Sequence, residues 1–549
     1  MDKSINKYIE ESIKRNWNGL ALTDLQGATL SYEDLAVKIA KLQITFDAAG
    51  IKPGDKIALC AKNSTQWAAA FFATITYGAV AVPLLHEFKP DALHHLITHS
   101  EAKILFVDGN IWSNLDADKL PNLKAAVRIS DYEMVLCRDE NVQAAHDGVE
   151  QLYKQKYPNG LQPCDVKYRD AQAEDLVVIN YTSGSTGNSK GVMIPQRALS
   201  SNMKYSIEHL SFLVPGDGVV CMLPLAHMYG LMIDLIHPIV KGCHVHFLSR
   251  SLSPKTILEA FRDVKPKLVV TVPLIVEKII KGKVFPLIAT PKMKMLLKTP
   301  VVRSIILKKI RKSIIKVFGG NLLELIVGGA ALDKSVDKFL SMIKFPITVG
   351  YGMTECAPLL AYAPWHETKS GCSGRLVDRM EMRIDSSDPK TVAGELWVKG
   401  ENVMLGYYHN EEATAAVMKD GWMNTGDLCN VDDDGFIYIR GRSKNMILGP
   451  SGQNIYPEEI EPAINNLDYV VESIVIEEKG KLIALIYPDF DAAKANGIEG
   501  DAVYDTLKAE VTEVNKSLPS YARVADVRVM KEEFEKTPKH SIKRFLYQK

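Results

Sequence analysis

The segment from Tyr181 to Gly191 has the composition of a loop that binds phosphate groups. Glycines at positions 184, 187 and 191 allow the backbone to turn so that its N–H groups converge on an anion. Hydroxyl groups and one cation accompany them: Thr182, Ser183, Ser185, Thr186 and Lys190. The spacing is not the Walker pattern, in which Gly-Lys-Ser/Thr follows four free positions. A loop of this kind is also typical of a flexible turn, so the phosphate hypothesis depends on other residues.

Glu355 ends the string Tyr351-Gly-Met-Thr-Glu355, which follows the apolar run Phe345–Val349. In open α/β sheets, ligands bind outside the carboxyl ends of the strands. A carboxylate is a hard oxygen ligand that suits Mg²⁺ bridging phosphate groups. The alternative for Glu355 is a surface carboxylate.

Asp427 follows Thr425 and Gly426, two residues that suit a tight turn. Its carboxylate can accept hydrogen bonds from both hydroxyls of a ribose, as an acidic residue does in dinucleotide-binding folds. Arg442 supplies a planar, permanently charged group for the same nucleotide. Taken alone, either residue is more often structural.

The segment Gly328-Gly-Ala-Ala331 follows the apolar run Leu325–Val327. Small side chains allow a ligand to approach the backbone, and they equally allow close packing of a helix on a strand. Both interpretations are compatible with the sequence.

Helical and strand patterns alternate over the first part of the chain, and this rhythm predicts an α/β fold with a mostly parallel sheet covered by helices. Ser31 to Asp34 is a helix start, and Pro53-Gly-Asp55 is a turn. We expect a helix over Trp67–Tyr77. Strands are expected at Lys56–Cys60, Ala79–Leu84, Ile104–Val107 and Leu176–Asn180.

The later part of the chain has short strands among turns, which we expect at Gly394–Gly400, Phe436–Arg440 and Ser473–Glu477. Asp432-Asp-Asp-Gly435 is expected to be a turn. We predict a large N-terminal domain of parallel-rich sheets over residues 1–441. A small mobile α+β domain is predicted over residues 442–549, a piece large enough to fold separately.

Together these strings resemble the adenylate-forming superfamily of acyl-CoA synthetases, peptide-synthetase adenylation domains and luciferases. The resemblance runs from about Ser31 to the C-terminus and rests on motifs in the family's order. They are the Tyr181–Gly191 string, Gly328–Ala331, Tyr351–Glu355, Thr425–Asp427, Gly441-Arg442 and Gly452-Gln-Asn-Ile-Tyr-Pro-Glu-Glu-Ile-Glu461.

The resemblance implies roles for individual residues. Thr182 and Glu355 are expected to hold Mg²⁺, Tyr351 to stack on adenine, and Lys190 to assist catalysis. His227, in the segment Leu223–Gly230 that resembles the border of the acyl pocket, is expected near the substrate carboxylate or its gate. The nucleotide site is expected to include Ser183, Gly184, Ser185, Thr186, Gly187, Gly329, Ala330, Gly350, Gly352, Thr354, Asp427 and Arg442.

The implied reaction has two halves, with ATP, Mg²⁺ and coenzyme A as cofactors. The carboxylate first attacks the α-phosphate of ATP, and a thiol then displaces AMP from the acyl-adenylate. In the family the C-terminal domain rotates between the halves about a hinge, which corresponds to Lys444 here, and Gly452 then faces the thiol tunnel. The string Gly452–Glu461 and the length of the segment from Lys444 to Gly452 are similar to the long-chain fatty acid branch.

The tail departs from the family, whose usual pattern is Thr-Pro-x-x-Lys-x-x-Arg with a lysine that contacts the α-phosphate and the attacking carboxylate. Here Thr537 to Arg544 places Ser541 at the lysine position. Losing one preorganised electrostatic donor costs roughly 10²–10³ in rate. Lys539 or Lys543 could supply the charge if the loop shifts. Otherwise adenylation is slow, or the chain is a non-catalytic acyl- or nucleotide-binding relative.

A basic amphipathic stretch spans residues 278–316, with twelve Lys or Arg residues and no Asp or Glu. Isoleucines and leucines alternate with the basic residues. Such a stretch suits an anionic membrane surface, and the alternative is a solvated basic face that packs on its own domain.

Composition limits the partners and the compartment. Sixty-six basic residues balance sixty-six acidic ones, which gives no global reason to expect nucleic acid. The eight cysteines are scattered and include no Cys-x-x-Cys pair, so we expect a reducing cytoplasm, with peripheral contact at the inner face of a membrane as an extension. We expect a fatty acid and coenzyme A as reactants, with a carrier protein as the alternative acceptor. Chain length and oligomeric state are left open.

Overall fold

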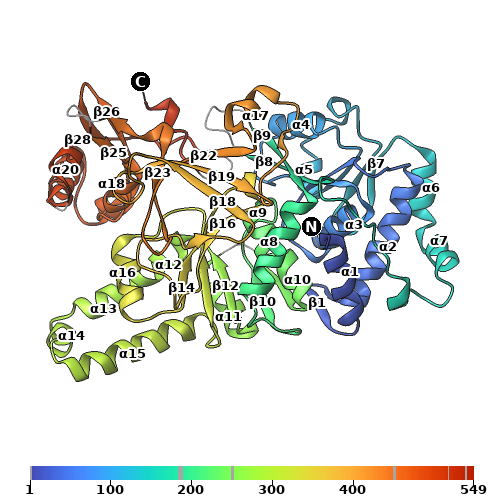
Figure 1. Cartoon of the computed structure of the whole chain (residues 1–549), viewed down its shortest axis with the longest axis horizontal. Coiled ribbons are helices and arrows are strands. Elements are labelled where there is room, and N and C mark those ends of the chain that lie inside the picture. The colour runs from blue at the N-terminus through green and yellow to red at the C-terminus, as the bar shows by residue number, and fades with distance from the viewer. Residues whose placement is uncertain are drawn as a thin grey trace. The chain divides into compact units, whose positions relative to one another are not determined.

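The computed structural model describes residues 3–182, 189–248, 253–448, 453–516, 518–537 and 541–548. The chain divides into two compact units (Figure 1). The first comprises Met1–Thr182, Lys190–Glu381 and Lys399–Gly421, and the second includes Met382–Val398 and Trp422–Lys549. Residues 422–441, placed in the N-terminal domain by the sequence, belong to the second unit, together with Met382–Val398. The boundary after Gly441 stays a prediction.

A mixed sheet forms the centre of the first unit and confirms the α/β fold. In spatial order its strands are β20 (Gly406–Tyr407), β9 (Lys190–Pro195), β8 (Leu176–Thr182), β4 (Val80–Pro83), β3 (Lys56–Cys60), β5 (Ile104–Val107), β6 (Ala125–Arg128) and β7 (Met134–Cys137). The middle strands from β8 to β6 are parallel, as predicted. The edges are antiparallel, because short connections join β6 to β7 and β8 to β9.

Local signals set the helices of this unit. The Ser31 Oγ accepts the Asp34 N–H at 3.0 Å, and the Asp34 carboxylate accepts the Ser31 N–H at 2.9 Å, which confirms the predicted start of α2 (Tyr32–Ala48). The predicted buried helix is α3 (Thr65–Tyr77), which begins after the cap Ser64. Other helices are α1 (Ile5–Arg15), α4 (Pro90–His99), α6 (Glu140–Asp147), α7 (Val149–Lys156) and α8 (Gln196–His209).

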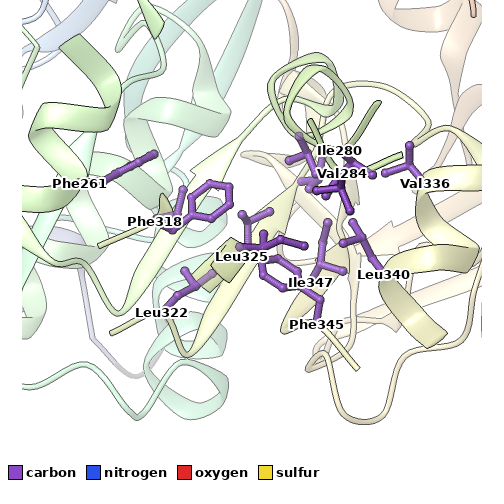
Figure 2. Close-up of a cluster of buried hydrophobic side chains, with 14 of the residues drawn as sticks. Phe261, Ile280, Val284, Phe318, Leu322, Leu325, Val336, Leu340, Phe345 and Ile347 are labelled. Carbon is purple, nitrogen blue, oxygen red and sulfur yellow. The ribbon is translucent and has the colours of Figure 1, made fainter. Parts of the chain in front are cut away.

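The first unit also contains smaller sheets, among them the following two. One has the order β10 (Gly218–Cys221), β11 (His244–Phe247), β1 (Leu20–Asp24) and β2 (Thr29–Ser31). The other is parallel, with the order β12 (Leu268–Thr271), β13 (Glu324–Val327) and β14 (Ile347–Val349). Buried side chains cover the parallel sheet, and Figure 2 shows Leu325 and Ile347 of its strands beside Phe318 and Phe345.

The basic stretch folds as a series of helices rather than one. They are α12 (Pro273–Ile279), the π-helical turn η4 (Ile280–Val284), α13 (Phe285–Ala289), α14 (Pro291–Leu296) and α15 (Pro300–Val317). Ile310 and Ile314 of α15 are buried in the same hydrophobic cluster as Phe318 and Phe345, with Ile306, Leu307 and Ile315 packed against it. One face of α15 therefore packs on its own unit, as the alternative interpretation of this stretch required.

The second unit contains β22 (Trp422–Val431) and β23 (Ile437–Arg442), joined by the predicted turn at Asp432–Gly435. Further on, β26 (Val470–Glu478), β27 (Lys481–Pro488) and β28 (Val524–Val529) form a sheet. Helices α18 (Pro457–Ile464) and α20 (Asp501–Asn515) pack on one face of it. The strand predicted at Gly394–Gly400 is β19, with the same bounds.

Among the described residues, no helix combines the length and the hydrophobicity needed to cross a membrane. All eight cysteines lie within the described ranges and are free thiols.

Glu324, at the start of β13, makes the stability of the first unit depend on pH. Burial raises the pKa of its carboxyl to about 7, although hydrogen bonds from the Tyr362 O–H and the Trp365 N–H, both 2.9 Å, oppose the shift. Between about pH 4.5 and pH 7 the unfolded chain releases this proton while the folded chain retains it. Folding stability from this group is therefore lost as the pH rises through that window.

We predict that Glu324→Gln stabilises the protein at high pH relative to low pH. The difference in unfolding free energy between variant and wild type should grow by about 2–3 kcal/mol from about pH 4.5 to about pH 8. Urea unfolding at both pH values measures it. Glu381→Gln, which removes an exposed carboxyl, is the control. If Glu324→Gln changes the unfolding free energy by the same amount at both pH values, the raised pKa of Glu324 is contradicted.

Candidate active site

Thr182 and Lys190 face each other at the ends of β8 and β9. They are partners in the antiparallel pairing of the two strands, and the Thr182 Oγ1 lies 3.5 Å from the Lys190 carbonyl oxygen. Both side chains are half-buried. The strands that precede and follow the predicted phosphate string in the sequence are therefore antiparallel neighbours. Ser183, Gly184, Ser185, Thr186 and Gly187 lie outside the described residues.

Tyr407 joins the predicted metal ligand Glu355 to Lys190. The Tyr407 O–H donates to the Glu355 Oε1 at 2.9 Å, and the Lys190 Nζ lies 4.8 Å from the centre of the Tyr407 ring. Tyr407 belongs to β20, whose pairing with β9 sets Tyr407 opposite Val192. Two predicted site residues that are far apart in the sequence are thus brought together by a tyrosine that the sequence analysis did not identify.

Two asparagines hold the turn that carries Glu355. The Asn202 side chain of α8 donates to the Cys356 carbonyl at 3.1 Å and accepts the Leu359 N–H at 3.0 Å. The Asn402 amide donates to the Leu359 carbonyl at 2.7 Å. Asn202 and Asn402 are both buried. Because the backbone on the carboxyl side of Glu355 is fixed at both ends, its carboxylate is held toward Tyr407.

The oxygen donors of this cluster suit Mg²⁺. A hydroxyl from Thr182 and a carboxylate from Glu355 are hard ligands of the kind that Mg²⁺ takes beside phosphate oxygens. The Oε1 of Glu355 accepts the Tyr407 hydrogen bond, and this carboxylate would hold the ion together with Thr182. These assignments remain predictions.

The small-residue segment after β13 lies beside the residues that follow β14. The Gly350 N–H donates to the Val327 carbonyl at 2.9 Å, so both segments leave the same edge of the parallel sheet. A Cβ on Gly328 would lie 3.0 Å from the Tyr229 ring, whereas Gly329, at φ +85°, has open space around it. Gly328 therefore allows close packing, whereas Gly329 and Ala330 are exposed and accessible to a ligand. The packing interpretation and the ligand interpretation thus apply to different residues.

The predicted adenine segment forms a tight reversal. Tyr351 and Gly352 form the short strand β15, and Thr354 begins a helical turn. A Cβ on Gly352 would lie 2.2 Å from the Pro358 carbonyl oxygen, so only glycine fits there. Tyr351 is half-buried at this edge.

His227 ends a segment that is fixed from both sides. The Asn63 side chain donates to the Leu223 carbonyl at 2.8 Å and accepts the Leu225 N–H at 3.0 Å. The Asn180 side chain of β8 donates to the Ala226 carbonyl at 2.8 Å. His227 therefore lies next to the strand that leads into the phosphate string. Neither asparagine was predicted, since no local pattern distinguishes them.

Behind this segment lies the π-helical turn η3 (Leu231–Ile236), which contains the buried Asp234. Its Oδ2 accepts the N–H groups of Met222 and Leu223, both at 3.3 Å. Burial raises the pKa of the Asp234 carboxyl to about 8, against those two hydrogen bonds. Asp234 thus positions the chain that leads to His227.

In the second unit, Asp427 and Arg442 form an ion pair, with 2.9 Å between Oδ1 and Nε. They are direct partners in the pairing of β22 and β23. Gly426 supplies the left-handed turn at φ +71°, and the Asp427 N–H donates to the Thr425 Oγ1 at 3.1 Å. Asp427 is buried and Arg442 is half-exposed, so the pair offers a carboxylate and a guanidinium at one strand edge.

The predicted hinge residue Lys444 is exposed in a helical turn, Ser443–Asn445. The Asn445 amide donates to the Glu458 Oε1 at 2.6 Å, and Arg440 lies 3.4 Å from Glu459. This segment therefore packs on the start of α18. Gly452 lies outside the described residues.

The tail that carries Ser541 is anchored on both sides. Phe534, Ile542 and Tyr547 cover the second face of the β26–β27 sheet, against Ile474, Ile476 and Leu485. Arg544 forms an ion pair with the buried Glu461 of α18. The Thr537 N–H donates to the Ser541 carbonyl at 2.8 Å.

These anchors fix the register of the tail. Ser541 is exposed, and the Lys543 Nζ lies 2.9 Å from the Glu535 Oε2. A shift of one residue would move Ile542 out of its apolar contacts and break the pair of Arg544 with Glu461. The placement of Ser541 at the lysine position stays a prediction. Lys539 lies outside the described residues.

We predict that Tyr407→Phe weakens the binding of ATP with Mg²⁺ roughly tenfold, because Glu355 loses the hydrogen bond that orients it. Titration calorimetry with a non-hydrolysable ATP analogue, with and without Mg²⁺, measures this loss. The control is Tyr408→Phe, which removes the 2.7 Å hydrogen bond to the Glu101 Oε2. Equal weakening in both variants would contradict the role of Tyr407.

Comparison with known proteins identifies the family of this chain. The model of the AMP-binding enzyme family matches residues 9–408, and that of the AMP-binding enzyme C-terminal domain matches residues 444–549.

Individual relatives differ in the acid that their names specify. The long-chain-fatty-acid–CoA ligase FadD15 of Mycobacterium bovis is 27% identical over 93% of this chain and 89% of its own. The 4-coumarate–CoA ligase 4 of Arabidopsis thaliana is also 27% identical, over 91% and 82%.

The anthranilate CoA ligase AuaEII, solved with anthranoyl-AMP, has a TM-score of 0.78 at 19% identity, over 99% of this chain and 96% of its own. This likeness confirms the fold. Because the family model covers most of the chain, the protein belongs to the family of AMP-binding enzymes, as the resemblance in its motifs implied.

Proposed function

We propose that this protein is an AMP-forming acid–thiol ligase that activates a fatty acid and transfers it to coenzyme A. The observation that carries the ATP-dependent half is the contact of Tyr407 with both Glu355 and Lys190, while Thr182 pairs with Lys190 across β8 and β9. The fatty acid is supported by relatives named as long-chain-fatty-acid–CoA ligases. A cytoplasmic location belongs to the same proposal, since free thiols suit a reducing compartment.

In the first step of this proposal, a carboxylate oxygen of the fatty acid attacks the α-phosphorus of ATP, and pyrophosphate leaves. In the second step, the thiol sulfur of coenzyme A attacks the acyl carbonyl carbon, and AMP leaves. The protein contributes mainly position and charge neutralisation. Lys190 and the ion held by Thr182 and Glu355 would neutralise phosphate oxygens, while Asp427 and Arg442 would hold the ribose.

The proposed hinge at Lys444 and the domain boundary after Gly441 accompany this mechanism. Domain rotation would allow one small domain to supply different residues to each step. Gly452 would then face the thiol. His227 would lie at the acyl end of the site, since Asn180 holds its segment beside β8.

Ser541 determines how fast the first step runs. In this proposal Ser541 presents a hydroxyl where the family has an ammonium group, and Lys543 is engaged by Glu535. We therefore expect slow adenylation in the wild type, unless Lys539 supplies the charge. A non-catalytic acyl- or nucleotide-binding protein is the second candidate, and the specific observation in its favour is this serine.

We predict that Ser541→Lys raises the rate of fatty-acid-dependent ATP–pyrophosphate exchange, by about 10²–10³ if Ser541 limits adenylation. The control is Ser520→Lys, which adds the same charge at another exposed serine of the second unit. No change in either variant would mean that another residue, such as Lys539, supplies the charge. A second variant, Lys539→Ala, should then abolish exchange.

The same assay over a series of fatty acids tests the proposed function itself. Exchange with a medium or long fatty acid, followed by release of AMP on addition of coenzyme A, is the expected result. If a product forms only with a carrier protein, the acceptor of the acyl group is that protein and not coenzyme A. The absence of exchange with every acid tested, in the wild type and in Ser541→Lys, would favour the non-catalytic candidate.

A further inference from the structure

The arm formed by α13, α14 and α15 has an outward surface with unusual composition. In Figure 1, α14 lies at the end of this arm, away from the strands β12 and β14 of its own unit. Large apolar side chains are exposed there: Leu287 is 52% exposed, Met295 68%, Val301 71% and Ile305 52%. Water-exposed apolar groups at such density mark an interaction site.

The two faces of α15 carry different residues. Ile310 and Ile314 face the core cluster of the first unit, as do Ile306 and Leu307 in part. On the opposite side, at helical spacing, lie the exposed residues Val301, Ile305, Lys308, Lys309, Lys312 and Lys316. The apolar pair belongs to the first turns and the lysines to the later ones, so one face presents an apolar end followed by a basic row.

The basic charge of the arm is largely uncompensated. Three of the twelve cations in residues 278–316 are engaged: Lys281 lies 3.4 Å from Asp333, Arg311 stacks on Trp365, and Arg303 contacts Met342. The other nine are exposed lysines, and the described residues give none of them an ion-pair partner. Since the stretch contains no acidic residue, these lysines suit a partner that carries many negative charges.

We propose that this surface docks the protein onto an anionic lipid membrane, with Leu287, Met295, Val301 and Ile305 entering the interface and the α15 lysines contacting phosphate headgroups. Exposed apolar side chains beside a row of lysines fit a lipid surface, which offers an apolar layer beneath its charges. An acidic protein partner would match the lysines alone. The proposal extends the proposed function, because a fatty acid substrate partitions into the same membrane, yet the docking itself needs no catalysis.

Sedimentation with lipid vesicles tests the proposal. We expect the full chain to bind vesicles of phosphatidylcholine with phosphatidylglycerol, to bind pure phosphatidylcholine weakly, and to dissociate as salt screens the charges. Each lysine near an anionic surface strengthens binding about fivefold. The combined variant Lys308→Gln, Lys309→Gln, Lys312→Gln and Lys316→Gln should therefore bind at least tenfold more weakly.

A matched control removes the same charge elsewhere on the first unit, at exposed lysines without an ion-pair partner among the described residues: Lys89→Gln, Lys119→Gln, Lys154→Gln and Lys167→Gln. This control should retain binding. A second variant, Val301→Gln with Ile305→Gln, should also lose binding, whereas Leu152→Gln, at another exposed leucine on a helix, should not. Glutamine is a good helix former, so the helices should persist.

Three results would overturn the proposal: no binding of the wild type to anionic vesicles, equal weakening in the control set, or lysine-dependent binding of an acidic carrier protein without binding to vesicles. Exchange activity with a short, water-soluble fatty acid in the absence of vesicles should be unchanged in every variant. Vesicle binding without exchange would count against the proposed function alone, and exchange without vesicle binding would count against docking alone.

Discussion

The hydrogen bond from Tyr407 to Glu355 is the contact on which the ATP-facing part of the first unit depends. Glu355 belongs to a turn after the parallel sheet of β12, β13 and β14, whereas Tyr407 belongs to the edge of the large mixed sheet. The bond therefore connects two sheets that share no strand pairing among the described residues. A carboxylate binds a cation best when its orientation is already fixed. Tyr407, together with Asn202 behind the turn, restricts the rotation of the Glu355 side chain.

A second constraint acts in the other unit, where the tail is anchored by apolar packing and by charge. Ile542 is held in the apolar layer under β26 and β27, and Arg544 is paired with Glu461, a buried residue of the motif that begins at Gly452. Burial raises the pKa of the Glu461 carboxyl, and the pairing with Arg544 opposes that shift. A buried carboxylate without its partner is costly, so the register of the tail is strongly specified. Ser541, next to Ile542, is therefore held close to these two anchors.

Much of the framework could be predicted from the sequence, because its signals are local. The strands Lys56–Cys60 and Ile104–Val107 are apolar runs between turns, and Ser31 with Asp34 forms a capping box within four residues. The pairing of Asp427 with Arg442 could not be predicted, although each residue was, because it depends on the register of two strands.

Tyr407, Asn63, Asn180 and Asn202 were missed because nothing near them in the sequence indicates a role. They contribute through contacts with segments far away in the chain, and such contacts exist only once the sheets have formed. The basic stretch shows a different limit. Each of the helices α13, α14 and α15 has a proline within its first two residues, and the helical periodicity restarts there. The charged and buried faces therefore could not be separated by pattern alone.

The two faces of α15 have a consequence for how this protein can diverge. Its inward isoleucines pack in the core, whereas Val301, Ile305 and the lysines of its outward face are exposed. Substitutions can therefore accumulate on the outer face without a penalty in folding or in nucleotide binding. Two copies of the gene that differ only on the outer face of α15 could encode proteins that act at different places in the cell. Their chemistry would be the same, and the sequence of this one helix would distinguish them.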